Sequence, residues 1–363
     1  MNQELTCNHY FDGDRMHGPH RIVIDAHGNV LEVTPFIGTA DYFCISPGLV
    51  DLQMNGFGVV DVASASPDDL MCLDHELQVM GTTSWLSTIT TAPLAQLSET
   101  IARLQVAYDS RDVAGLIGVH IEGPFLGQSP GAHRVKNIIA ADSEWISTLT
   151  SVVRIMTLAP EQDGVIEAIS QLRTQGICVS IGHSQPSDEE YDRAISAGAT
   201  MVTHLFNAMS GVHHRNAGLA LRALTDDRVS VGLIADLVHV QPSALALAFR
   251  SKGEHNVCLV SDSVGWNSPA ISPSGVVATN AVRMPNGTLA GSCVPLAAGV
   301  RNVVQSCSVS LERALRASTS APADVLTRDD LGRIKVGKPC DIVAFDASLT
   351  VVSTWVRLPS VGA

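Results

Sequence analysis

The sequence predicts an α/β protein in which a (β/α)8 barrel of the TIM type carries a small β-sandwich domain formed by both chain ends. Three observations predict this fold. Eight short, nearly continuous apolar runs occur within about 215 residues, as is typical of strands buried on both faces of a parallel sheet. Helical patterns lie between several of these runs, and alternating strands and helices indicate a parallel α/β fold. The two flanking segments contain β patterns instead.

Eight predicted strands suit a closed barrel better than the main alternative, a doubly wound open sheet. The open sheet rarely needs eight parallel strands, and no GxGxxG motif follows the first run. We therefore expect a barrel whose active site lies at the carboxyl ends of its strands. The runs are 48–53, 83–88, 116–122, 152–158, 177–182, 200–204, 231–235 and 257–262.

Helix start and stop signals separate several of these runs. Ser66 precedes Pro67 and an acidic first turn, which predicts an N-cap followed by a helix that ends near Gly81. Apolar residues at three- and four-residue spacing predict an amphipathic helix over 94–108. Ser187 and Glu190 have the spacing of a capping box, with Gly198 ending that helix. A further helical run begins at residue 242 and closes at residue 253.

The flanks of the barrel are expected to be β structure. Segments 21–25 and 30–33 predict a hairpin, and 332–337 and 340–345 predict strands. The Asn-Gly pair at 286–287 indicates a turn in an extra hairpin, 276–291, after the eighth strand. We expect residues 1–47 and 332–363 to form the β-sandwich, and residues 48–331 to form the metal-dependent barrel domain.

Composition excludes several classes of protein. Apolar residues make up 45% of the chain, which excludes disorder, and the net charge of −13 disfavours nucleic acid and anionic membranes as partners. Because no apolar run approaches the ~18 residues of a membrane span, and the first residues are polar and acidic, neither a membrane segment nor a signal peptide is expected. The eight widely spaced cysteines contain no CxxC and predict reduced thiols in a cytoplasmic protein.

Polar residues at the predicted strand ends indicate a metal site. Glu122, His183 and His204 end the third, fifth and sixth strands, and one carboxylate with two imidazoles leaves a fourth zinc position open for water. Each histidine alone would more often be an ordinary core residue, but together with Glu122 they favour a ligand set. Asp262 ends the eighth strand and is the candidate general base or acid, since a carboxylate there is costly to bury merely as a cap.

Other polar residues near strand ends leave alternatives open. His120 shares a strand face with Glu122 and is expected to give structural support. Arg215 is one of few cations near a strand end, so it is either a phosphate or carboxylate anchor or a solvated loop residue. His239, after Asp236 at the end of the seventh strand, is either a second anchor or a surface histidine.

An ordered set of motifs spanning residues 47–346 resembles the N-acetylglucosamine-6-phosphate deacetylases of the amidohydrolase superfamily. This resemblance implies hydrolysis of the N-acetyl group of N-acetylglucosamine 6-phosphate to glucosamine 6-phosphate and acetate by a homodimer. The motifs are PGLVDLQMNG at 47–56, GVHIEGPFL at 118–126, GAH at 131–133, GHS at 182–184, THLFNAMSG at 203–211, RNAGL at 215–219, IADLVHV at 234–240, LVSDS at 259–263, NGTLAGS at 286–292 and GRIKVGKPCDIVAFD at 332–346.

The resemblance also implies residue roles. Glu122, His183 and His204 would hold one divalent metal, usually Zn²⁺, with Asp262 as catalytic acid and base. His133 would contact the sugar and help to polarise the acetyl carbonyl. The remaining substrate-binding positions implied are Ala132, Asn207, Ala208, Arg215, Asp236, His239, Leu289, Ala290 and Gly291, with Arg215 and His239 on the 6-phosphate.

Three departures from the superfamily pattern limit the metal and substrate predictions. Gln53 and Asn55 stand where many members carry the His-x-His pair of a second metal, which predicts a single metal. No lysine ends the fourth strand, which disfavours a carbamylated-lysine bridge. Leu237 stands where members often have glycine, which leaves the exact amino sugar open.

Three alternatives to this function remain, although the missing His-x-His pair and lysine count against most cyclic amidases and deaminases. The same deacetylation could act on N-acetylgalactosamine 6-phosphate, or the chain could be a cyclic amidase or deaminase. It could also be a non-catalytic sugar-phosphate-binding protein, although binding alone would not need Asp262 beside a metal triad.

Overall fold

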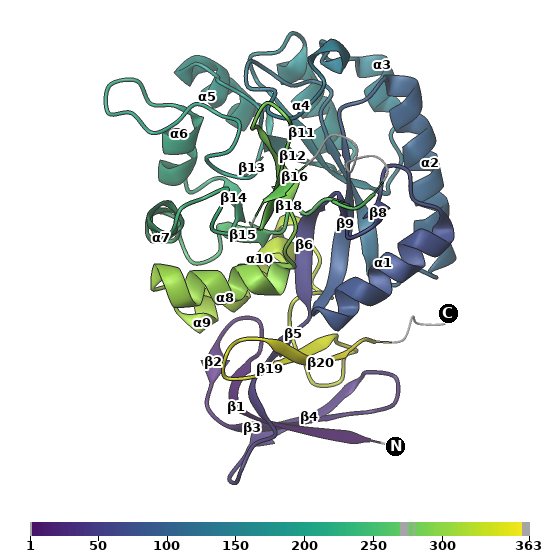
Figure 1. The fold of residues 1–363 in the computed structure, drawn as a ribbon, viewed down its shortest axis with the longest axis vertical. Coiled ribbons are helices and arrows are strands. Elements are labelled where there is room, and N and C mark those ends of the chain that lie inside the picture. Colours follow the sequence, from purple (N-terminus) through teal and green to yellow (C-terminus); the bar gives the residue numbers. More distant parts are fainter. Residues whose placement is uncertain (1, 269–275, 279, 358–363) are drawn as a thin grey trace.

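The predicted barrel is confirmed. The computed structural model describes residues 2–268, 276–278 and 280–357. Its centre is an eight-stranded parallel sheet in the order β15-β14-β13-β12-β11-β10-β9-β6, nearly closed by a parallel bridge between Met54 and Ser263 (Figure 1). Each strand falls on a predicted apolar run. The strands are β6 (Leu49–Met54), β9 (Thr82–Thr90), β10 (Leu116–Glu122), β11 (Val153–Leu158), β12 (Cys178–Ile181), β13 (Met201–Val202), β14 (Ser230–Ile234) and β15 (Val257–Val260).

Helices surround this sheet, and the predicted caps are present. The Ser66 side chain accepts from the Asp69 N–H in a complete capping box, and Ser187 forms the same box with Glu190. The helices are α1 (Pro67–Val79), α2 (Leu94–Ser110), the 3₁₀ turn η1 (Val135–Asn137), α3 (Ser143–Ser147), α4 (Val165–Thr174), α5 (Asp188–Ala197), α6 (Leu219–Thr225), α7 (Pro242–Ser251), α8 (Leu296–Cys307), α9 (Leu311–Arg316) and α10 (Ser320–Val325). No described helix is long and apolar enough to cross a membrane.

Both chain ends meet below the barrel, as expected, but their strands form one mixed β-sheet where the sequence predicts a sandwich (Figure 1). Its order is β20-β19-β5-β1-β3-β4, and β2 pairs with β1. The predicted 21–25/30–33 hairpin is the antiparallel pair β3–β4. The strands are β1 (Gln3–Phe11), β2 (Met16–His17), β3 (His20–Ile24), β4 (Val30–Pro35), β5 (Tyr42–Pro47), β19 (Ile342–Phe345) and β20 (Val351–Trp355).

The predicted strand at 332–337 is wrong. This segment is irregular and turns at Gly332 and Gly337, whose φ angles are 68° and 81°. It makes single backbone bonds, such as Ile334 N–H to the Asp12 carbonyl at 2.8 Å. Because β19 is already paired with β5 on one side and β20 on the other, this segment cannot join the sheet beside β19.

The predicted hairpin after the last barrel strand contains three strands. They are β16 (Val276–Ala278), β17 (Ala281–Arg283) and β18 (Leu289–Ser292). The predicted Asn-Gly turn at 286–287 lies between β17 and β18, while residue 279 of the hairpin lies outside the described residues. A two-stranded ribbon of β7 (Gly56–Phe57) and β8 (Val60–Asp61) follows the first barrel strand.

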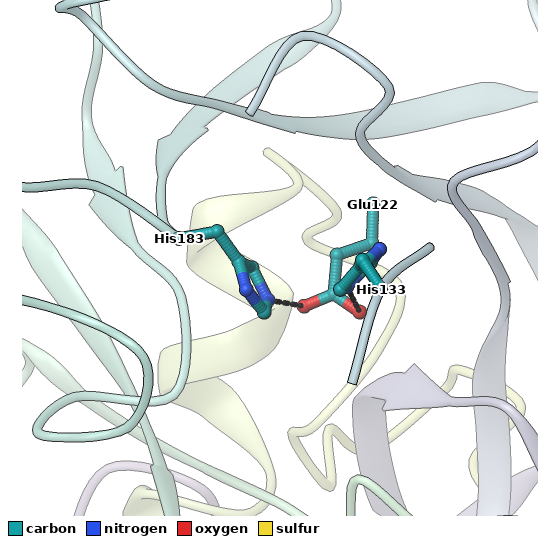
Figure 2. A group of neighbouring side chains, drawn as sticks. All are labelled: Glu122, His133 and His183. Atoms are coloured by element: carbon teal, nitrogen blue, oxygen red, sulfur yellow. Dashed lines mark hydrogen bonds and ion pairs between the residues drawn. The ribbon is translucent and has the colours of Figure 1, made fainter. Parts of the chain in front are cut away.

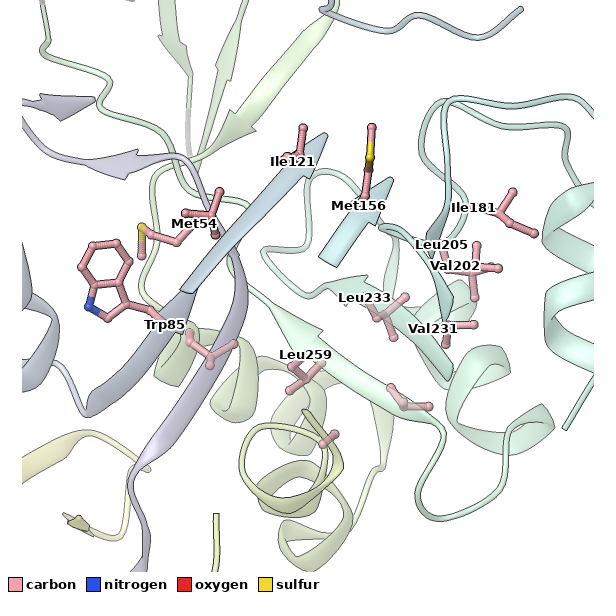
Figure 3. Packing of buried hydrophobic residues seen from close by; sticks show 14 of the residues in the cluster. Met54, Trp85, Ile121, Met156, Ile181, Val202, Leu205, Val231, Leu233 and Leu259 are labelled. Carbon is pink, nitrogen blue, oxygen red and sulfur yellow. The ribbon is translucent and has the colours of Figure 1, made fainter. Parts of the chain in front are cut away.

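Apolar side chains on the two faces of the barrel strands belong to two different clusters. Polar groups of the candidate site lie at the strand ends. The larger cluster packs strands against the surrounding helices and includes Trp85 and Ile121 (Figure 3). A smaller cluster joins Val50 and Leu52 of β6 to Ala321 of α10. This division follows from the two-residue period of a strand. All eight cysteines are free.

Candidate functional site

Three predicted ligands converge where β10, β12 and β13 end. Glu122 Oε1 lies 3.2 Å from His183 Nε2 and 3.0 Å from His204 Nε2, and the two Nε2 atoms are 3.1 Å apart. All three side chains are at most 6% exposed. Ligands bound tetrahedrally to one zinc at about 2.0–2.1 Å are about 3.3 Å from one another. The spacing of these atoms therefore fits a single ion of this size.

The hydrogen-bond chemistry of His183 also fits a cation. Its Nδ1 lies 3.1 Å from the carbonyl of Ser129, which can only accept, so Nδ1 carries the hydrogen. In the neutral ring, Nε2 then directs a lone pair at Glu122 Oε1, which also carries lone pairs. Two acceptors at 3.2 Å repel each other unless a positive charge lies between them. His204 Nδ1 is buried with no partner among the described residues, so no contact there fixes which ring nitrogen of His204 carries hydrogen.

Buried charge shifts the ionisation of these groups. Burial and the neighbouring His133 lower the pKa of His183 to about 4, so this imidazole is neutral at pH 7. Burial alone would raise the pKa of Glu122, but the neighbouring imidazoles of His133, His183 and His204 hold that pKa well below its ordinary value. An ionised carboxylate beside a neutral imidazole is the protonation state that metal binding needs.

His133 forms a second possible ligand set with the same carboxylate. Figure 2 shows Glu122, His133 and His183 pointing toward one another, and one ligand atom from each lies within 4.8 Å of the others. His133 Nε2 is 3.7 Å from Glu122 Oε2. A Cβ at Gly131 (φ 57°) would lie 3.3 Å from the His183 ring and 3.4 Å from Ala208, so the loop carrying Ala132 and His133 packs against the site.

The two positions that replace a second-metal pair hydrogen-bond to the site carboxylates. Gln53 Nε2 donates to Glu122 Oε1 at 2.9 Å, and Asn55 Nδ2 donates to Asp262 Oδ1 at 2.9 Å. Gln53 lies in β6 and Asn55 directly follows that strand, so the first barrel strand positions both carboxylates. Each amide N–H occupies a carboxylate lone pair that would otherwise be available to a second ion.

Asp262 is partly buried beside this group. Burial and the charge of Glu122 raise the pKa of Asp262 to about 6, close to the pH at which a general base works. The Asp262 carbonyl accepts from the Ser292 N–H at 2.9 Å, which places β18 against it. A Cβ at Gly291 would lie 2.9 Å from that carbonyl, so only glycine fits there without displacing the strand. The predicted substrate positions Leu289, Ala290 and Gly291 therefore lie next to the candidate base.

Left-handed backbone is concentrated at the strand ends. L-residues with side chains rarely adopt positive φ, at a cost of order 1–3 kcal/mol each, and such residues cluster at functional sites. Among the described residues, ten that are not glycine have positive φ, and six of these follow barrel strands: His183 (52°), His204 (28°), Phe206 (77°), Ala208 (48°), Leu237 (66°) and Asp262 (45°).

Asp236 and His239 form a buried pair on the same rim. His239 Nδ1 lies 2.6 Å from Asp236 Oδ2, with both side chains at most 5% exposed. Asp236 Oδ1 also accepts the N–H groups of Val238 and His239 at 2.9 and 2.8 Å. This pairing leaves His239 Nε2 free to meet a ligand. Leu237, between them, is half-buried against the core.

Arg215 is not joined to this pair by any described contact. It is exposed, and its backbone N–H faces His213 Nδ1 at 3.4 Å. Its loop borders a cavity of about 520 Å³ that contains none of the proposed metal ligands and is lined by Gln185, Pro186, residues 210–213 and residues 216–218. Asn207 instead bonds locally, donating from Nδ2 to the His204 carbonyl at 3.2 Å.

The sequence interpretation assigned no role to two residues that contact the site. Thr91, directly after β9, lies 2.8 Å from His133 Nδ1 through its Oγ1, and Ser129 orients His183. The position of Thr91 at a strand end was an available signal. His120 acts as expected, since it is buried below the ligands and bonded to the Leu52 carbonyl and to Thr157 Oγ1.

Comparisons with known proteins agree with this arrangement. Residues 44–360 match the model of the amidohydrolase family. The chain is 33% identical over 336 residues to N-acetylglucosamine-6-phosphate deacetylase of Bos taurus, covering 86% of this chain and 82% of that protein. It is 32% identical over 351 residues to N-acetylgalactosamine-6-phosphate deacetylase of Escherichia coli O157:H7, covering 92% of each.

Solved structures give the same result. A mutant N-acetyl-D-glucosamine-6-phosphate deacetylase from Mycobacterium smegmatis, in complex with N-acetyl-D-glucosamine-6-phosphate, superposes with a TM-score of 0.89. It is 26% identical, and the match covers 98% of both chains.

Proposed function

The chain belongs to the amidohydrolase family, and we propose that it hydrolyses the N-acetyl group of N-acetylglucosamine 6-phosphate to glucosamine 6-phosphate and acetate. It is a hydrolase acting on an amide C–N bond. One observation of the structure carries the proposal. Glu122, His183 and His204 converge within 3.2 Å at the barrel mouth, beside the partly buried carboxylate of Asp262.

The proposed chemistry is divided between a metal and two side chains, Asp262 and His133. Glu122, His183 and His204 would hold a divalent metal, which when bound would supply Lewis acidity for the attacking water and the acetyl carbonyl. Asp262 accepts the proton of the attacking water and then delivers it to the departing amine. His133 donates a hydrogen bond to the acetyl oxygen as negative charge develops there. One carboxylate can serve twice because the two proton transfers are sequential.

The remaining rim residues would bind the sugar phosphate. Arg215 and His239 anchor the 6-phosphate, with Asp236 holding the His239 ring by its Nδ1. Ala132, Asn207, Ala208 and the 289–291 strand would line the sugar. The location of β18 against Asp262 supports this assignment, since it places one wall beside the candidate base.

N-acetylgalactosamine 6-phosphate is the second candidate substrate. The similarity to the Escherichia coli O157:H7 enzyme, 32% identical over 92% of each chain, is close to that of the glucosamine relatives. Both substrates carry the same acetamide and 6-phosphate and differ only in the configuration of one hydroxyl. The metal site and the base therefore cannot distinguish them.

Acetate release from a panel of substrates tests both candidates. The panel contains N-acetylglucosamine and N-acetylgalactosamine, each with and without a 6-phosphate, incubated with metal-reconstituted protein. We expect release from the phosphorylated sugars and the highest kcat/KM for N-acetylglucosamine 6-phosphate. Binding of sugar phosphate without acetate release under any divalent metal would support the non-catalytic alternative instead.

Metal identity, assembly and location form part of the same proposal. Two imidazoles and one carboxylate suit zinc, and the Gln53 and Asn55 amides support a single ion, so one Zn²⁺ per chain is expected by elemental analysis. A homodimer in the cytoplasm is expected from the family resemblance. Sedimentation measurements and cell fractionation test these two points.

A further inference from the structure

Thr91 and His133 form a buried contact at the edge of the metal centre. Thr91 follows β9 and is 7% exposed, and the His133 side chain is 5% exposed. Thr91 Oγ1 lies 2.8 Å from His133 Nδ1, and the Thr91 backbone N–H points at the same nitrogen at 3.4 Å. The hydroxyl and the backbone N–H of Thr91 therefore both contact Nδ1 of His133.

The backbone N–H decides which nitrogen of His133 carries hydrogen. An N–H can only donate, so Nδ1 must present a lone pair, and a neutral ring then carries its hydrogen on Nε2. The hydroxyl can donate to the same Nδ1. In the opposite tautomer, the hydroxyl would donate to the Glu122 carbonyl at 3.2 Å, and two N–H groups would face each other.

The carboxylate of Glu122 favours the same tautomer. His133 Nε2 is 3.7 Å from Glu122 Oε2. A hydrogen on Nε2 is attracted to that carboxylate, whereas a lone pair would be repelled by it. Thr91, directly after β9, and Glu122, at the end of β10, therefore favour the same tautomer of His133 from opposite sides of the ring.

We propose that Thr91 is a positioning residue that holds His133 in the tautomer with hydrogen on Nε2, so that His133 is a hydrogen-bond donor and not a metal ligand. This tautomer excludes the ligand set that contains His133, because an Nε2 that carries hydrogen has no lone pair for an ion. The expected effect of Thr91 on catalysis rests on the proposed deacetylation. The tautomer of the His133 ring does not depend on it.

The tautomer is measured directly by long-range ¹H–¹⁵N correlation spectra of protein labelled on histidine nitrogens, with zinc bound. The signals of His133 are identified by their loss in His133→Gln. We expect the pattern of a neutral ring with hydrogen on Nε2. Hydrogen on Nδ1, or a metal-bound Nε2, would overturn the proposal even if the protein released no acetate.

Kinetics of threonine variants test the role of the contact. Thr91→Val removes the hydroxyl at nearly constant shape, and we expect kcat to fall about 10- to 100-fold, as for other groups that orient a site histidine, with little change in KM. Thr91→Ser restores the hydroxyl and recovers most of that loss. Bound metal stays at the wild-type stoichiometry in both variants.

A matched control separates positioning from general packing. Thr100 on α2 is also buried, at 8% exposure, and lies outside the site, so Thr100→Val makes the same chemical change elsewhere. We expect wild-type kcat for it. An equal loss in both valine variants, or loss of metal in Thr91→Val, would refute the positioning role. If Thr91→Val does not fold, the spectrum of the wild-type ring still decides.

Discussion

Replacing Asp262 by asparagine should remove activity and at the same time stabilise the metal-free fold. The asparagine side chain has the same size as that of Asp262, whose Oδ1 lies 2.9 Å from Asn55 Nδ2, and it can still accept this hydrogen bond. It can no longer take a proton. Loss of a general acid and base costs roughly 10²- to 10⁴-fold in rate. This corresponds to about 3–5.5 kcal/mol of transition-state stabilisation.

The stability gain follows from the buried charge. A pKa raised from 3.8 to about 6 means that ionising Asp262 inside the fold costs about 3 kcal/mol more than in the unfolded chain. The folded state holds this proton more tightly, so stability falls as pH rises from about 4 to about 6, and the full penalty is present above that range. Asp262→Asn carries no such penalty and should be more stable at pH 8 by up to about 3 kcal/mol.

Two assays check these outcomes together. Acetate release with saturating metal measures the rate, and urea unfolding of chelated protein at pH 4 and pH 8 measures the stability difference. Asp74→Asn is the matched control, because Asp74 is also a buried carboxylate but bonds Trp85 and Gly115 away from the site. Turnover of Asp262→Asn above one tenth of wild type would refute its role. An unchanged stability difference between the two pH values would refute the burial argument.

Three further predictions follow from the site and the helix caps. Glu122→Gln removes the carboxylate that meets both imidazoles, so we expect elemental analysis to find bound metal reduced at least tenfold; full metal occupancy would exclude Glu122 as a ligand. Arg215→Ala should raise KM for 6-phosphorylated substrates at least tenfold and leave hydrolysis of the unphosphorylated sugar unchanged; equal effects on both would exclude a phosphate anchor. Ser187→Ala deletes the N-cap of α5 and should lower unfolding stability by about 1 kcal/mol in urea titration without changing kcat; an unchanged midpoint would contradict the cap.

Local patterns determined most of the fold before any tertiary contact was known. Apolar runs located all eight barrel strands, and the serine and glycine signals located α1 and α5. The failure at 332–337 shows the limit of such patterns. Alternation predicts that a segment can be a strand, but β19 already had partners on both sides, and pairing depends on which sheet edges remain.

The sequence by itself also determined which residues share the barrel mouth. Parallel strands end on one rim, so Glu122, His183 and His204 had to approach one another once the barrel was recognised. Only the tertiary structure decided how they are held. Gln53 reaches Glu122 across 69 positions of the chain, and Asn55 reaches Asp262 across 207. A two-residue period tells which face a side chain occupies, whereas hydrogen-bond partners, tautomers and pKa values depend on strand register and burial, which exist only after the barrel closes.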